Sequence, residues 1–413
     1  MRSRPPLDPA TAALIRAARA PQRGSFSRRS LLAGGGLGAF AALAGCAPPE
    51  PPAGGVAQLD LPEDVSEQEK IVRWANWTAY LDYDEDSKSY PTLDAFEEKT
   101  GIKATYSEDV DDNDSYFNKV APQLRAGQDI GRDIVTFTDW MANRIIQQQL
   151  AQPLDMVQMG NVAQNMLPSL KAVPFDPGRQ FSVTWQSGFA GIGYNKKKVG
   201  RELKTLEDLW AEDLRGRITV LSEFRDTLGV IMLEQGVDIN GDITTEQFQG
   251  AVDEVDRRIS DGYIRRVKGN SYLEDLKSGN AIAGIVWSGD LFVLRAETED
   301  DSWEFVIPES GGTMWSDNLM VPMTSTHKDN AETLIDYYYD PKVAAEVAAW
   351  VNYICPVEGA QKAMEKIDPD LAESPFIFPT EDYLSDNNIQ FFAALEPEQD
   401  AEFSETWQRV VGN

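Results

Sequence analysis

The sequence predicts an α/β protein, in which strands and helices alternate along the chain. From residue 71 onward, short apolar stretches alternate with amphipathic stretches that have helical spacing. Gly101 follows the helix expected over 92–100, and glycine commonly ends helices. The 413 residues are 42% hydrophobic and 25% charged, which is typical of folded globular proteins. A strand–helix alternation of this kind favours units with parallel sheets.

The expected elements follow one another in a regular order. Strands are expected over 71–76, 102–106, 133–137, 182–185, 191–194, 217–221, 281–287, 305–307 and 318–321. Helices are expected over 92–100, 114–126, 140–149, 206–210, 227–235, 245–259, 272–277, 291–297, 329–338, 343–351 and two later segments. Pro122 predicts a kink or break in the second helix. Ser187 and Gly188 are expected to join two separate strands.

The composition excludes several classes of protein. There are 67 acidic and 38 basic residues, which gives a formal net charge of -29 and argues against nucleic-acid binding. Two cysteines are too few for a disulfide framework or a cysteine-rich zinc site. His327 is the single histidine, so multi-histidine metal sites and histidine-dependent triads are disfavoured.

The first 45 residues predict an export signal. Arg28 and Arg29 form a twin-arginine core within 27–32, and an apolar run over 31–45 follows. That run is too short for a comfortable membrane span. Residues 43–46 (Leu-Ala-Gly-Cys) resemble a bacterial lipobox, which predicts that Cys46 is acylated and becomes the new N-terminus. The alternative is a buried Ala/Gly helix with a chance arginine pair. Residues 46–70 are expected to form a flexible tether.

No cofactor is expected from the motifs of the mature chain. Asp-rich stretches at 82–86, 109–113 and 238–242 lack the glycine and glutamate that calcium loops place at positions 6 and 12. No phosphate-binding loop, nucleophile elbow or dinucleotide fingerprint is present after residue 45. We therefore expect neither a metal nor a catalytic nucleophile.

Aromatic residues beside acids point to a binding role. The chain has 10 Trp and 13 Tyr, and several stand next to polar or acidic residues at expected strand ends, at 76–80, 138–140, 287–290 and 315–317. Strand ends are where α/β folds place binding crevices. Carboxylates and ring faces bind ammonium groups, and rings also shield methylene chains from water. The alternative is that these tryptophans only pack the core.

The chain resembles the spermidine/putrescine-binding proteins of polyamine ABC transporters, a branch of the two-lobed bacterial solute-binding proteins. The resemblance extends from about residue 71 to 357. It rests on the order and spacing of stretches at 76–80, 96–103, 133–135, 191–195, 206–210, 285–289 and 311–317. It implies a two-lobed α/β fold with a ligand cleft. Lobe 1 would comprise 71–185 and 310–413, and lobe 2 would comprise 190–306, joined by strands near 184–191 and 308–315.

The resemblance also implies a set of ligand-binding residues. The first lobe would contribute Trp77, Thr78, Tyr80, Thr138 and Trp140. The second lobe and the returning segment would contribute Glu223, Asp226, Trp287, Trp315, Asp317 and Tyr353. Trp140 stands where the family usually has tyrosine, and Glu223 and Asp226 exchange the family's usual order of acids. Whether Asp139 or Gln390 contacts the ligand stays open.

The implied function is capture of a polyamine, with spermidine favoured over putrescine, and delivery to an ABC permease and its ATPase. The protein is expected to be a monomer that is exported by the twin-arginine route and lipid-anchored outside the cytoplasmic membrane. Three alternatives stay open: another cationic organic solute, an amine-sensing ectodomain, and a glycosidase that uses Glu223 and Asp226 as paired carboxylates.

Overall fold

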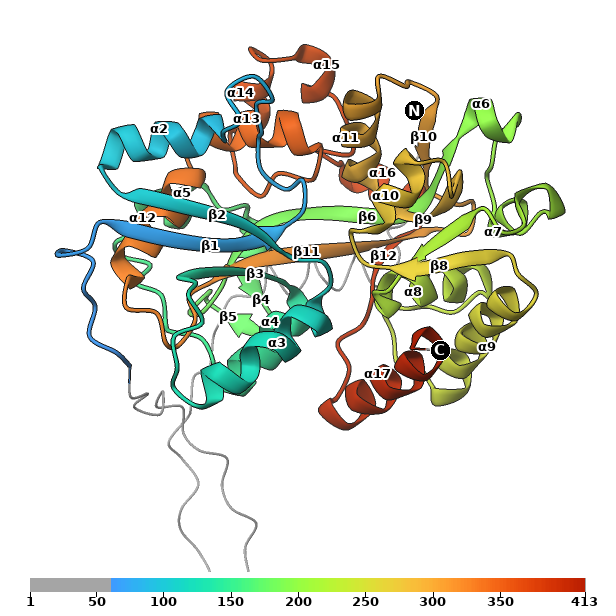
Figure 1. Cartoon of the computed structure of the whole chain (residues 1–413), viewed down its shortest axis with the longest axis horizontal. Helices are drawn as coiled ribbons and strands as arrows, with labels where there is room; N and C mark the ends of the chain where they lie inside the picture. Colours follow the sequence, from blue (N-terminus) through green and yellow to red (C-terminus); the bar gives the residue numbers. More distant parts are fainter. Residues whose placement is uncertain (1–60, 413) are drawn as a thin grey trace, which may run out of the picture. The chain divides into compact units, whose positions relative to one another are not determined.

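A ten-stranded sheet organises the computed structural model, which describes residues 61–412 (Figure 1). The predicted export signal and Cys46 lie outside the described residues. The strands are β1 (Ile71–Trp77), β2 (Lys103–Val110), β3 (Ile134–Thr138), β6 (Val183–Asn195), β7 (Ile218–Leu221), β8 (Ile264–Lys268), β9 (Ala283–Trp287), β10 (Trp303–Val306), β11 (Gly312–Met320) and β12 (Ile389–Phe391), with β4 (Ala172–Val173) and β5 (Asp176–Pro177) as a separate pair.

The main sheet has two parallel parts joined by antiparallel strands. Its order is β2-β1-β3-β11-β6-β9-β7-β8, with β10 beside β6 and β12 beside β11. We call β2, β1 and β3 the first half and β9, β7 and β8 the second half. Pairing within each half is parallel, whereas β11 and β6 pair antiparallel with each other and with their neighbours β3 and β9. The expectation of parallel sheets therefore holds within each half, whereas the central strands are antiparallel.

Helices follow most of these strands. They are α2 (Pro91–Thr100), α3 (Asn113–Arg125), α4 (Asp139–Gln147), α5 (Gly160–Asn165), α6 (Lys196–Val199), α7 (Leu206–Leu209), α8 (Phe224–Glu234), α9 (Thr245–Ser260), α10 (Tyr272–Lys277), α11 (Ser288–Thr298), α12 (Lys328–Tyr338), α13 (Pro341–Val351), α14 (Ala360–Met364), α15 (Pro369–Ala372), α16 (Glu381–Asp386) and α17 (Pro397–Val411). No helix within residues 61–412 is both long and apolar enough to cross a membrane.

Strand β6 is one continuous strand of 13 residues, which corrects the expectation of two strands joined at 187–188. All of its residues are buried. Gly188 makes the continuity possible, because a Cβ there would lie 2.5 Å from the Trp315 ring and 2.7 Å from the Tyr353 ring. Glycine therefore marks a close approach of side chains to the strand rather than a turn.

Helix α3 also differs from its expectation, since Pro122 lies inside it and the helix continues to Arg125. Asp112 caps the helix by accepting a hydrogen bond from the Ser115 amide at 2.8 Å. Phe117, Val120 and Leu124 are all buried, as the helical spacing predicts.

Two sets of contacts bear on the ends of the described chain, one at the last residues of the expected tether and one at the C-terminal helix. The Val65 amide donates to the Thr326 carbonyl at 2.8 Å, and Glu69 lies 3.1 Å from His327 Nε2. These contacts hold the end of the predicted tether against the chain near α12. Helix α17 packs on α9 beside the second half, because Phe403 stacks on Phe248. The sequence, by contrast, predicts that this helix, within 310–413, belongs to lobe 1. Stacking between residues 155 positions apart has no local sequence pattern.

Candidate functional site

The predicted site residues lie where strands of both halves end. Trp77 is the last residue of β1, Thr138 the last of β3 and Trp287 the last of β9. Glu223 follows β7 and is the N-cap of α8. The carboxyl ends of parallel strands meet at one edge of a sheet, which is why strand–helix units gather side chains there. The expectation that aromatic and polar residues stand at strand ends is confirmed for Trp77, Thr138 and Trp287, whereas Trp315 lies inside β11.

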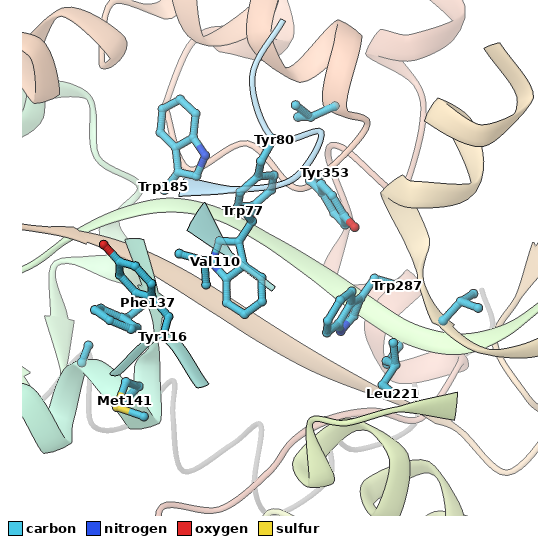
Figure 2. Packing of buried hydrophobic residues seen from close by; sticks show 14 of the residues in the cluster. Trp77, Tyr80, Val110, Tyr116, Phe137, Met141, Trp185, Leu221, Trp287 and Tyr353 are labelled. Carbon is cyan, nitrogen blue, oxygen red and sulfur yellow. The ribbon is translucent and has the colours of Figure 1, made fainter. Parts of the chain in front are cut away.

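Aromatic rings from four segments form a cage beside the paired strands β6 and β11. The ring centroid of Tyr353 lies 5.4 Å from that of Tyr80 and 5.1 Å from that of Trp315. Trp287 lies 6.4 Å from Trp315 and 6.0 Å from Trp77. Figure 2 shows Trp77, Tyr80, Tyr353 and Trp287 gathered along the two long strands. The four pairs are edge-to-face, an arrangement that aromatic rings favour because the positive edge of one ring meets the negative face of the other. We call these five residues the aromatic cage.

Asp317 lies at the centre of the sheet beside the aromatic cage. It pairs with Thr138 across β11 and β3, at a place where the register of β11 against β6 shifts. The Thr138 hydroxyl donates to Asp317 Oδ1 at 2.7 Å. Burial raises the pKa of Asp317 to about 7, even though the contacts with Thr138 and Tyr80 act in the opposite direction. Burial therefore disfavours the charged form of this carboxyl.

Asp226 belongs to α8 of the second half and contacts the cage through Trp287. Its carboxylate accepts hydrogen bonds from Trp287 Nε1 at 2.8 Å and from the Thr313 hydroxyl at 3.0 Å. Burial raises its pKa to about 6. The indole donor fixes the Trp287 ring, so the acid and the ring are positioned together.

Asp290 is a third acid at the cage, and the list of predicted site residues omitted it. Its carboxylate accepts from the hydroxyls of Tyr272 at 2.7 Å and Tyr353 at 2.8 Å. Burial raises its pKa to about 6. The stretch 287–290, in which an acid follows Trp287 by three residues, was the sequence pattern that could have identified it.

Glu223 faces the first half rather than the cage. Its Oε1 accepts hydrogen bonds from the Asn113 backbone amide at 3.1 Å and from Asn113 Nδ2 at 3.0 Å. Asn113 Nδ2 also donates to the Thr138 hydroxyl at 2.9 Å. A chain of hydrogen bonds thus connects Glu223 of the second half to Asp317 through two polar residues of the first. Burial, with the nearby charge of Asp112, raises the pKa of Glu223 well above its usual range.

Two further predicted residues, Thr78 and Trp140, and the two residues left open, Asp139 and Gln390, have different surroundings. Thr78 is half-buried in the turn after β1. Trp140 lies in the first turn of α4, where the guanidinium of Arg225 is 4.0 Å from its ring centroid. Asp139 accepts from Asn318 Nδ2 at 2.6 Å, and the charge of Arg179 lies nearby. Gln390, in β12, accepts from the Ile239 amide at 2.9 Å. Asp139 and Gln390, whose contact with the ligand the sequence left undecided, therefore both have hydrogen-bond partners within the protein.

The profile of the bacterial extracellular solute-binding proteins matches residues 91–377. The chain belongs to this family. The spermidine/putrescine-binding periplasmic protein of Escherichia coli K12 is 25% identical over 344 residues, which are 82% of this chain and 91% of that protein. The putrescine-binding periplasmic protein PotF of the same organism is 23% identical over 360 residues, covering 83% of this chain and 92% of that protein.

A solved structure supports the same fold for this solute-binding protein. The spermidine/putrescine ABC transporter substrate-binding protein of Streptococcus pneumoniae matches with a TM-score of 0.63 and 23% identity, covering 82% of this chain and 98% of that one. The two-lobed α/β solute-binding fold expected from the sequence is thereby confirmed. Within residues 61–412, no group of three His, Cys, Asp or Glu side chains is placed to hold a metal ion.

Proposed function

We propose that this solute-binding protein captures a polyamine outside the cytoplasm and delivers it to the permease and ATPase of an ABC importer. One observation carries the proposal: Asp226, Asp290 and Asp317 are buried around an aromatic cage without a cationic partner. Within the described residues, no lysine or arginine forms a salt bridge with any of the three. Burying an ionised carboxylate costs free energy unless the charge is paired. A cationic ligand would offset this cost for all three acids.

The proposed mechanism is closure of two lobes on the amine. Lobe 1 would be built on 71–185 and the segment returning from 310, and lobe 2 on 190–306. Carboxylates and rings approach from both sides, so neither lobe alone satisfies the ligand and binding favours the closed form. The net charge of -29 would concentrate polycations near the cleft, less so at high salt. No covalent bond is made or broken in this scheme.

Spermidine is expected to bind more tightly than putrescine. Putrescine has two ammonium groups, whereas spermidine has a third that requires a further carboxylate. In calorimetric titrations with putrescine, spermidine, spermine and cationic amino acids, spermidine should give the lowest Kd. The double variant Glu223→Gln, Asp226→Asn should lose more spermidine affinity than putrescine affinity, because it removes the acid at Trp287 and the acid that is linked to Asp317 through Asn113 and Thr138.

Asp82→Asn is the matched control for these titrations. Asp82 is a buried acid whose pKa burial raises to about 6, and its partner is Thr92 rather than a cage residue. A wild-type preference for putrescine, or an equal loss for both amines, would contradict the proposed role in length selection. Tighter binding of a cationic amino acid would favour the other-solute alternative, and no amine binding at all would contradict the proposed function.

Cys46 is proposed to be the lipid-anchored N-terminus of the mature protein. Cys46→Ala should move the protein from the membrane fraction to the soluble exported fraction, because acylation requires the thiol. Arg28→Lys, Arg29→Lys serves as a comparison, since it should retain the precursor in the cytoplasm. Immunoblots of cell fractions would measure both, and a processed Cys46→Ala protein that stays with membranes would refute the anchor.

A further inference from the structure

Helix α17 is attached firmly to the second half of the protein. Phe403 and Phe248 of α9 stack with ring centroids 3.8 Å apart and nearly parallel planes. Trp407 Nε1 donates to the Ser222 carbonyl, immediately after β7, at 2.6 Å. Phe403 and Trp407 are both buried. The helix therefore moves with the second half.

The N-terminal turns of α17 reach the first half through Asp400. Its carboxylate accepts a hydrogen bond from Arg225, which belongs to α8 of the second half. The other carboxylate oxygen accepts from Arg144 Nη2 at 2.6 Å, and Arg144 belongs to α4 of the first half. Arg144 also pairs with Asp114 of α3 at 2.8 Å. One carboxylate thus joins arginines of the two halves.

Trp140 adds an apolar contact to this ionic cluster. Its ring centroid lies 4.0 Å from the Arg225 guanidinium and 4.8 Å from that of Arg144. Arginine stacks readily on aromatic faces, and a planar guanidinium loses little freedom when it does so. The side chain of Arg225 is only 10% exposed and that of Asp400 18% exposed. A pair so shielded from water is screened less by salt than a surface pair.

We propose that α17 is a clasp that holds the two halves closed and slows ligand release. Asp400 makes the ionic contact between the halves. On the first half, Arg144 binds its carboxylate and Trp140 packs against the arginines. The clasp would act on the closed form alone, because opening separates Arg144 from Arg225. The cluster lies outside the aromatic cage, so it would alter residence time rather than the contacts that recognise the amine. The effect on release rests on the proposed function, whereas the effect on closure does not.

The clasp is tested without ligand by hydrogen–deuterium exchange on the full chain. The amides of Asn270 and Ser271, which follow β8 of the second half, donate to Asp111, which follows β2 of the first half, at 3.0 and 2.7 Å, so their exchange would report separation of the halves. Asp400→Asn should accelerate their exchange about tenfold, because the carboxylate charge that both arginines need is gone. Glu398→Gln removes an exposed charge from the same turn of α17 and should change nothing.

A second arm measures release of spermidine by stopped-flow tryptophan fluorescence. Asp400→Asn should raise the dissociation rate about tenfold and change the association rate by less than about twofold. Arg144→Gln leaves α17 docked on the second half and should give the same result, which guards against a folding defect at Asp400. If spermidine does not bind, the exchange arm still decides the proposal. Exchange rates in both variants equal to those of Glu398→Gln would overturn it.

Discussion

Replacing Asp317 with alanine is expected to weaken polyamine binding by at least about two orders of magnitude, because truncating one side of a desolvated charge pair leaves the other side unpaired. Asp317 is buried beside the aromatic cage, and its hydrogen-bond donor is the neutral hydroxyl of Thr138. Calorimetric titration with spermidine would measure the loss. A loss below tenfold would remove Asp317 from the ligand site.

The stability and pH behaviour of this variant provide its controls. Burial raises the pKa of Asp317 to about 7, so the ionised form is disfavoured in the folded protein. An acid whose pKa is raised by folding stabilises the folded protein at low pH, and this contribution is lost as pH rises through the folded-state pKa. At pH 8 the Asp317 carboxyl therefore contributes no such stability, and Asp317→Asn should not lower the Tm. Wild-type affinity should fall as pH decreases from 8 to 6, since protons compete with ammonium at this carboxylate. Asp317→Asn should flatten that dependence.

Gly269→Ala is expected to prevent closure. A Cβ at this position would lie 1.9 Å from the Asp111 carbonyl oxygen, which accepts the hydrogen bond from the Asn270 amide. The backbone fixes the position of both atoms, because a Cβ has no torsion that moves it and the carbonyl oxygen belongs to the main chain. Neither atom can therefore rotate away. If the closed form falls to about 1% of the population, the apparent affinity falls about a hundredfold. Affinity for spermidine and exchange at the Asn270 amide would measure the two consequences.

Gly250→Ala is the matched control for this substitution. Gly250 lies in α9 of the same half, and a Cβ there would meet only Gln235 Oε1, at 3.8 Å. It should leave affinity unchanged and raise stability slightly, because alanine favours helix more than glycine does. An unchanged affinity in Gly269→Ala would show that ligand capture does not need the contact between Asp111 and the 269–271 segment.

The sequence alone determined the class of the fold and much of the cage. Strand–helix alternation predicted the α/β class, and the family resemblance predicted two lobes. Trp77 and Trp287 were expected at strand ends because apolar runs stop there, and both end strands in the structure. Trp315 and Asp317 are two residues apart, a spacing that places side chains on one face of a regular strand. In the structure the Trp315 ring contacts Tyr80, and the Asp317 carboxyl acts electrostatically on the same tyrosine. These predictions depend on local periodicity, which a single sequence displays.

Only the tertiary structure decided which polar groups meet. Glu223 and Asp226 are three residues apart, yet one accepts from Asn113 of the first half and the other from Trp287 of the second. Asp400 lies 256 positions from Arg144, and nothing local in the sequence indicates their pairing. Such contacts depend on how separate strands and helices pack, so the direction of a side chain near the end of an element is settled by its neighbours in space. For the same reason Gly188, which could have marked a turn, proved to make room for the rings of Trp315 and Tyr353.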